Sequence, residues 1–135
     1  MTLSRRALLA ASLVPTLAQW PLAARAQAYP DRPIRLAVGY APGTAPDVLA
    51  RLFAIRLSEL LKQQVVVDNK PGAGGQIAAL TVAKAVPDGY MLLLGEVGSI
   101  SIAPAAFGKL GYAPSRELTG ISEVARVDFC LLYTS

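Results

Sequence analysis

The residue types that most often perform catalysis are scarce in this chain. Its 135 residues include no histidine and one cysteine, Cys130. Without histidine there is no imidazole to act as a general base, a metal ligand or part of a Ser/His or Cys/His nucleophile. A lone cysteine forms neither an intrachain disulfide nor a zinc cluster. The acids Asp47, Glu96 and Asp88 remain, and without a histidine or a metal cluster they are weak grounds for catalysis. The residue types present exclude hydrolase triads, and we expect neither a metal nor a cofactor.

One loop that could bind a ligand lies between an expected strand and an expected helix. Free backbone N–H groups and the positive end of the helix dipole at such a junction attract anions, including carboxylates. The structural alternative is that Asp47 caps the helix and its carboxylate occupies the same N–H groups. The candidate ligand-binding residues of this loop are Tyr40, Ala41, Pro42, Gly43, Thr44 and Asp47.

A second candidate loop follows the third expected strand and contains Glu96, Val97, Gly98 and Ser99. It offers a carboxylate, hydroxyl groups and glycine backbone to a ligand. In the structural alternative, Ser99 or Ser101 caps the next helix. Asp88 belongs to the turn before that strand, so we expect it at the opposite end of the sheet.

A glycine-rich stretch from Lys70 to Gln76 also follows a strand and opens a helix, as a dinucleotide-binding loop does. With Gly72 and Gly74 as the first two glycines, Ile77 stands where glycine or alanine belongs. No Lys-Ser/Thr pair follows to complete a phosphate loop. A tight turn for close packing of helix and strand is the better interpretation.

The elements that position these loops alternate between strand and helix. Apolar and β-branched runs predict strands at 34–38, 64–68 and 90–94, and helical periodicity predicts helices at 47–61 and 76–86. A short helix at 102–107 and a loop at 108–114 are expected to follow. The order β-α-β-α-β with short loops implies a parallel sheet with right-handed crossovers. Ligands bind beyond the carboxyl ends of such strands, which places both candidate loops at one rim. The residues expected to face the core from the helices are Leu49, Phe53, Leu57, Leu60 and Leu61, then Ile77 and Leu80.

The basic charge of the chain is concentrated at its start. The formal net charge is +4, but Arg5, Arg6 and Arg25 precede residue 29 and no acid does, which leaves 10 basic and 9 acidic residues in the remainder. Those basic residues form no stripe with interleaved aromatics, so we expect no nucleic-acid partner.

Residues 1–28 have the form of a secretory signal peptide. They show a basic start, an apolar stretch and small-x-small sites, with cleavage after Ala26 or Ala28. Proline and glutamine interrupt the apolar stretch, so we expect no stable membrane insertion after cleavage. The paired arginines leave the general secretory route and the twin-arginine route both open. The expected destination is the periplasm.

Several spaced motifs in one order resemble the Bug (TctC-type) family, the extracytoplasmic solute-binding receptors of tripartite tricarboxylate transporters. The motifs are Tyr29-Pro30-Asp31-Arg32-Pro33-Ile34-Arg35, Ala41-Pro42-Gly43 with Asp47, Asn69-Lys70-Pro71-Gly72-Ala73-Gly74-Gly75, Pro87-Asp88-Gly89-Tyr90 and Leu93-Leu94-Gly95. The resemblance covers about residues 29–127. It implies an α/β, periplasmic-binding-protein-like (type II) fold whose two lobes close on a small carboxylate, with membrane permease subunits as partners. It also implies that the protein performs no chemistry and is not an enzyme. Residues 29–135 would be the N-terminal lobe, with the second lobe absent.

The resemblance also implies that the two candidate loops hold the ligand carboxylate, and here the chain departs from the family. Thr44 and Pro46 stand where the family usually has a second glycine and a hydroxyl residue, and Glu96 replaces a small hydroxyl residue. A carboxylate at position 96 would repel an anionic ligand unless the ligand carries an amine. We therefore expect a preference for zwitterionic or amine-bearing acids. Two alternatives to the receptor remain, a nucleotide-binding α/β enzyme half and a truncated fragment without autonomous function.

Overall fold

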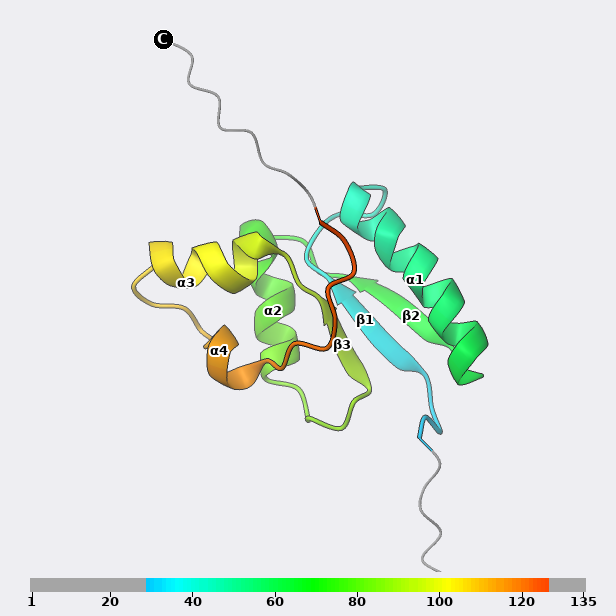
Figure 1. The fold of residues 1–135 in the computed structure, drawn as a ribbon. Coiled ribbons are helices and arrows are strands. Elements are labelled where there is room, and N and C mark those ends of the chain that lie inside the picture. Colours follow the sequence, from blue (N-terminus) through cyan, green and yellow to red (C-terminus); the bar gives the residue numbers. More distant parts are fainter. Residues whose placement is uncertain (1–28, 127–135) are drawn as a thin grey trace, which may run out of the picture.

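The computed structural model describes residues 29–126, which form a three-stranded parallel sheet flanked by helices (Figure 1). The predicted signal peptide and Cys130 lie outside the described residues. The strands are β1 (Ile34–Val38), β2 (Val65–Asn69) and β3 (Met91–Leu94), in the order β2-β1-β3. Ile34 is opposite Val65 on one side of β1, and Arg35 is opposite Met91 on the other. The predicted parallel β-α-β-α-β arrangement is confirmed.

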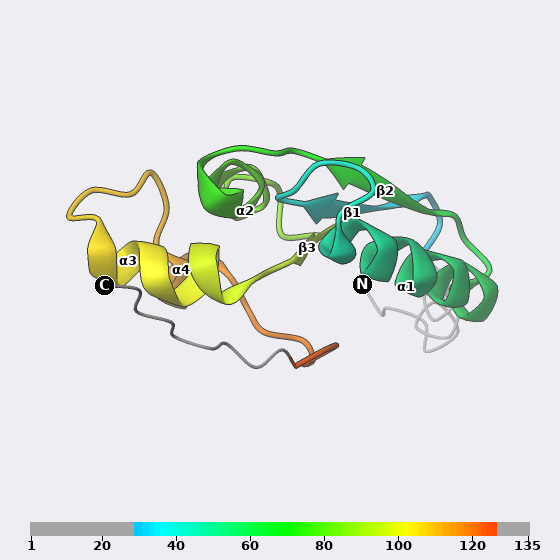
Figure 2. The same ribbon diagram turned by 90° about the horizontal axis from the view of Figure 1, so that it is seen from above.

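Strand β1 is the central strand of the sheet, and four of its five residues are buried, with Arg35 as the exposed one. Its side chains Ile34, Leu36 and Val38 form the core together with Ala50, Ala54 and Val65. The α-helix α1 (Ala45–Leu61) joins β1 to β2, and α2 (Gln76–Ala83) leads from β2 toward β3. Since the two connections run to opposite sides of β1, right-handed crossovers place the helices on opposite faces of the sheet, as Figure 2 shows.

Helix α1 begins two residues earlier than predicted, because Thr44 and not Asp47 occupies the N-cap position. Pro46 is accommodated in the first turn, where a backbone N–H has no partner within the helix. The predicted inward stripe is largely confirmed: Leu49, Phe53, Leu57 and Leu61 are half-buried around the buried Ala50 and Ala54. Leu60 is the exception, since it is 78% exposed.

The orientation predicted for the second helix is wrong. In α2 the buried residues are Ala78 and Ala79, whereas Ile77 and Leu80 are 48% and 37% exposed. Alanine lets the helix backbone approach the sheet closely, and this turns the larger side chains outward. The helix also ends at Ala83 and not at residue 86.

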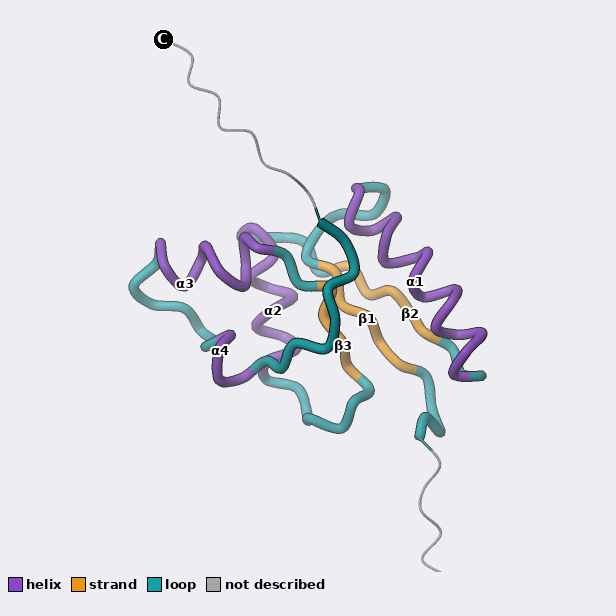
Figure 3. The backbone as a smooth tube through the Cα atoms, in the orientation of Figure 1, coloured by secondary structure: helices purple, strands orange, loops and turns teal. Residues whose placement is uncertain are grey.

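The segment after β3 also differs from the prediction of a short helix at 102–107. A π-helical turn, η2 (Gly98–Ile102), runs directly into α3 (Ala103–Ala106). A further short helix, α4 (Pro114–Glu117), begins at the last residue of the loop predicted at 108–114. Figure 3 shows how the loops after the strands gather on one side of the sheet. The candidate residues of the second loop therefore include the first turn of a helix.

The opposite end of the sheet is closed by residues near the start of the described chain. Arg32 pairs with Asp88 at 2.8 Å and lies 4.1 Å over the ring of Tyr90. The Tyr29 hydroxyl donates to the Gly89 carbonyl at 2.8 Å. Asp88 is thus placed away from the rim, as predicted, and takes part in a structural contact.

Candidate functional site

Three loops meet at the carboxyl edge of the sheet, one after each strand. A β-carbon placed on Gly39, directly after β1, would lie 2.5 Å from Cα of Gly75 in the loop after β2. A β-carbon on Gly75 would lie 3.6 Å from the Ser99 side chain, which follows β3. The first of these distances is too short for a real β-carbon, so the two backbones can approach this closely only with glycine at position 39. The interpretation of 70–76 as a tight packing turn is therefore confirmed, and the loops form one rim.

The turn of the first loop is closed by its own polar groups. Thr44 makes no side-chain cap to α1. Its hydroxyl donates instead to the Ala41 carbonyl at 2.7 Å. The Gly43 N–H donates to Oδ2 of Asp47 at 2.8 Å. The structural alternative considered for Asp47 is therefore wrong in its detail, because its carboxylate holds the turn before the helix and does not act from the N-cap position.

Asp47 is the centre of a buried polar network that ties the first loop to β2. It is 2% exposed, and besides Gly43 it accepts hydrogen bonds from Arg51 Nε at 3.0 Å and Asn69 Nδ2 at 2.9 Å. Asn69 also donates to the Tyr40 carbonyl at 3.0 Å. These donors, with Arg51 contributing most, hold the pKa of Asp47 well below its usual range.

Sequence reasoning missed Arg51 and Asn69 as members of this network. The spacing of Asp47 and Arg51, four residues apart on one helix, was a signal that could have identified the first. Nothing local in the sequence connects Asn69 to Asp47.

The second loop is anchored through backbone atoms of Glu96 and Ser99. The Glu96 carbonyl accepts the Ile100 N–H at 3.0 Å and the Ser99 hydroxyl at 3.2 Å. The Ser99 carbonyl accepts the Tyr112 hydroxyl at 2.7 Å, and burial raises the pKa of Tyr112. The Ser99 hydroxyl thus donates back to the start of the helical turn and does not cap it as an acceptor. Ser99 is 3% exposed, so the sequence-predicted contact through its hydroxyl would require it to exchange this partner.

The side chains of Tyr40 and Glu96 connect the two candidate loops. The Glu96 carboxylate near the Tyr40 hydroxyl, together with burial, raises the pKa of Tyr40. The Tyr40 ring lies beside both neighbouring loops: its Cε2 would be 3.6 Å from a β-carbon on Gly75, and its hydroxyl 4.0 Å from one on Gly98. The structure therefore brings together residues from both predicted loops at one place.

The ten candidate residues differ in how far a ligand could reach them. Asp47 and Ser99 are buried and act on other protein groups. Four candidates are exposed: Ala41, Pro42, Gly43 and Val97. Four are half-buried: Tyr40, Thr44, Glu96 and Gly98. The accessible part of the rim thus consists of loop backbone and helix starts, with Glu96 as its charged side chain.

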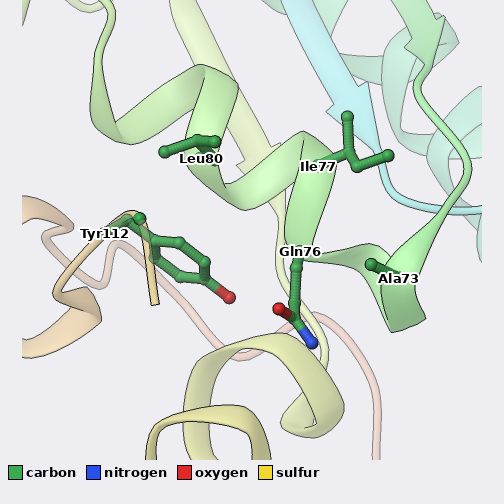
Figure 4. Close-up of a pocket in the computed structure, with 6 residues that line it drawn as sticks. Ala73, Gln76, Ile77, Leu80 and Tyr112 are labelled. Atoms are coloured by element: carbon green, nitrogen blue, oxygen red, sulfur yellow. The ribbon is translucent and has the colours of Figure 1, made fainter. Parts of the chain in front are cut away.

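Two hollows in residues 29–126 lie away from this rim. One, of about 180 Å³, lies between α2 and the loop before α4 (Figure 4), and its lining includes Gln76, Leu80 and Tyr112. The other, of about 520 Å³, lies between α1 and β2 and is lined by Arg51, Ile55 and Ser58 among others. Neither includes a predicted site residue, and neither is enclosed. In the same residues no cluster of three or more histidine, cysteine, aspartate or glutamate side chains could hold a metal ion, and no helix is long and apolar enough to cross a membrane.

Solved structures place this fold among the periplasmic binding proteins. BugD, a periplasmic binding protein, is 43% identical with a TM-score of 0.63, over 66% of this chain and 29% of BugD. MatC from Rhodopseudomonas palustris, solved with bound malate, is 38% identical with a TM-score of 0.63, over 66% of this chain and 30% of MatC. A second R. palustris protein, solved with adipate, is 40% identical with a TM-score of 0.62, over 64% of this chain and 29% of that protein.

Sequence comparison then defines the family. The profile of the tripartite tricarboxylate transporter family receptors, TctC, matches residues 49–135. The chain belongs to this family, and the resemblance found from the motifs is confirmed.

Curated relatives agree with this assignment. A UPF0065 protein of Bordetella bronchiseptica is 43% identical over 81% of this chain and 32% of its own length. Protein BugT of Bordetella pertussis is 41% identical over 79% of this chain and 33% of its own length. The chain spans about a third of the length of these relatives.

Proposed function

We propose that this chain is part of a periplasmic receptor that captures a small carboxylate for a tripartite tricarboxylate-type transporter. The observation that carries the proposal is the family match over residues 49–135. Two similar proteins were solved with the dicarboxylates malate and adipate, which supports a carboxylate as the ligand here. The permease subunits of the transporter are the proposed partners. Residues 1–28 are proposed to be the export signal, and residues 29–135 to belong to the N-terminal of two lobes.

The proposed binding site is the rim formed by the two candidate loops. Helix α1 has no side-chain cap, and the helical turn that starts near Val97 has none either. Backbone N–H groups at such helix starts favour a carboxylate, and the helix dipoles add to the attraction. Asp47 is proposed to support this site indirectly, because its carboxylate holds Gly43 and the Tyr40 backbone through Asn69. A binding role without chemistry fits a site made mainly of backbone groups.

The proposal is tested by calorimetric titration of the full-length gene product with malate, succinate and adipate. Val97→Asp places a carboxylate at the rim, at a position that is 45% exposed. A negative charge near a helix start does not disturb the fold, but it repels a carboxylate ligand. We expect Val97→Asp to weaken binding by about tenfold or more.

The matched control is Val86→Asp, which adds the same charge in the 73% exposed turn at the other end of the sheet. We expect this variant to bind like the wild type. The proposed site is wrong if both variants bind equally well. The proposed function is wrong if the wild-type protein binds no carboxylate.

A further inference from the structure

Glu96 differs from the other acidic residues in its surroundings. Among residues 29–126, the acids in ion pairs with lysine or arginine are Asp47, Glu59, Asp68, Asp88, Glu117 and Glu123. Asp31 accepts the Tyr90 hydroxyl at 2.6 Å, at the far end of the sheet. Glu96 takes part in no ion pair within this range. The rim thus contains a carboxylate whose charge no lysine or arginine of the described residues balances.

The position of this carboxylate is fixed by the fold. Glu96 comes one residue after Gly95 at the end of β3, and its carbonyl accepts two hydrogen bonds from the helical turn that follows. The residue is half-buried, and its carboxylate lies close enough to the Tyr40 hydroxyl to raise the pKa of Tyr40. Tyr40 in turn is held through its carbonyl by Asn69. The fold therefore holds the charge of Glu96 at a defined position between two loops.

A negative charge held at a defined position discriminates between ligands that are otherwise alike. At a separation of about 6 Å and an effective dielectric constant near 20, repulsion between two unit charges corresponds to about a hundredfold change in Kd. Solvent screening at a half-exposed position reduces this to about tenfold. The same charge attracts an ammonium group by a similar factor. Discrimination of this kind needs both an attractive partner and a rejected one.

Resting on the proposed carboxylate receptor, we propose that Glu96 is a specificity-determining residue that selects carboxylates bearing an ammonium group. In this arrangement the helix starts hold the ligand carboxylate and Glu96 accepts the ligand ammonium group. The selected ligands are amino acids and related zwitterions, and acids without an amine are rejected by repulsion.

The test compares matched ligands that differ only in one substituent. Aspartate and malate share a four-carbon dicarboxylate frame and carry an ammonium group or a hydroxyl group at the same carbon. Glutamate with 2-hydroxyglutarate, and 2-aminoadipate with 2-hydroxyadipate, are the same comparison in longer frames. Calorimetry on the full-length gene product gives the ratio of the two Kd values for each pair. We expect the wild-type protein to favour the amine-bearing member of at least one pair by about tenfold or more.

Glu96→Gln removes the charge and keeps a side-chain oxygen that can still accept from Tyr40. We expect it to weaken binding of the amine-bearing acid and strengthen binding of the hydroxy acid, so that the ratio falls by about tenfold or more. Glu59→Gln is the matched control, because it removes the same charge from an exposed position near the far end of α1. This control is expected to leave the ratio unchanged.

The outcomes separate the two proposals. If hydroxy acids or amino acids bind but Glu96→Gln leaves the ratio unchanged, the selectivity of Glu96 is refuted while the carboxylate receptor stands. The same conclusion follows if Glu59→Gln changes the ratio as much as Glu96→Gln does. If the wild-type protein binds no acid from any pair, both proposals fail.

Discussion

The close approach of Gly39 and Gly75 determines the shape of the rim, and Gly39→Ala tests it directly. The added β-carbon would lie 2.5 Å from Cα, 3.2 Å from the carbonyl oxygen and 3.3 Å from the carbonyl carbon of Gly75. All three are backbone atoms, so no side-chain rotation can relieve the clash. One loop must move away from the other, at the place where the proposed ligand contacts are formed.

The expected cost follows from what overpacking does in tightly packed sites. An extra methyl group that forces a backbone shift costs about 1 to 3 kcal/mol in the free energy of unfolding. With a urea m-value of about 2 kcal/mol per molar, the midpoint of urea unfolding falls by roughly 0.5 to 1.5 M. Circular dichroism in increasing urea measures this midpoint.

Gly120→Ala is the matched control, because a β-carbon there would meet nothing within 4 Å. Alanine in place of glycine at a permissive position is neutral or stabilises by a few tenths to about 1 kcal/mol, since it restricts the unfolded chain. We therefore expect the two alanine variants to change stability in different directions. Equal midpoints for Gly39→Ala and Gly120→Ala would refute the role assigned to the contact between the two glycines.

Three further predictions concern the polar groups around the rim. The folded-state pKa of Asp47 is depressed, so the stability that Asp47 contributes is present above its unfolded-state pKa of about 4 and is lost as the pH falls below that value. Asp47→Asn should therefore lower the free energy of unfolding at pH 7 and reduce its dependence on pH in acid. Urea midpoints measured at several pH values check this. Tyr112→Phe leaves the Ser99 carbonyl without its buried donor and should cost about 1 to 3 kcal/mol in urea unfolding, whereas an unchanged midpoint would contradict this role. The pKa of the Tyr40 hydroxyl should lie above its usual range, and Glu96→Gln should lower the pKa of Tyr40 because it removes the nearby negative charge. Ultraviolet absorbance titration checks this, with Tyr40→Phe to identify the signal of Tyr40.

The sequence was sufficient to predict the sheet and the place of the site. Ile34, Leu36 and Val38 alternate along one strand, as apolar residues on one face of a strand do, and three consecutive valines from Val65 form another strand. The short connections then allow only a parallel sheet, and parallel strands bring their following loops to one edge. The positions of both candidate loops at the rim follow from this topology alone.

The ends and faces of the helices were less predictable. In α2 the pattern of alanine and larger residues is compatible with either face turned inward. The outcome depended on how closely Gly39 and Gly75 let the chain approach the sheet, and this buried Ala78 and Ala79 while Ile77 and Leu80 faced outward. The helix after β3 began earlier than its composition suggested, because the Glu96 carbonyl accepts the Ile100 N–H as well as the Ser99 hydroxyl.

The sequence by itself determined the family, the parallel topology and the two loops at the rim, because local periodicity and spaced motifs are properties of neighbouring residues. Only the tertiary structure decided which polar groups in those loops are hydrogen-bonded to other parts of the protein. Asp47 and Asn69 lie 22 residues apart along the chain, yet they share a hydrogen bond that fixes the first loop. Tyr40 reaches Glu96 in the same way across the edge of the sheet. Such contacts form only when separate strands align, so no local pattern could have predicted that Asp47 is buried while Glu96 has no ion pair with a lysine or arginine of residues 29–126.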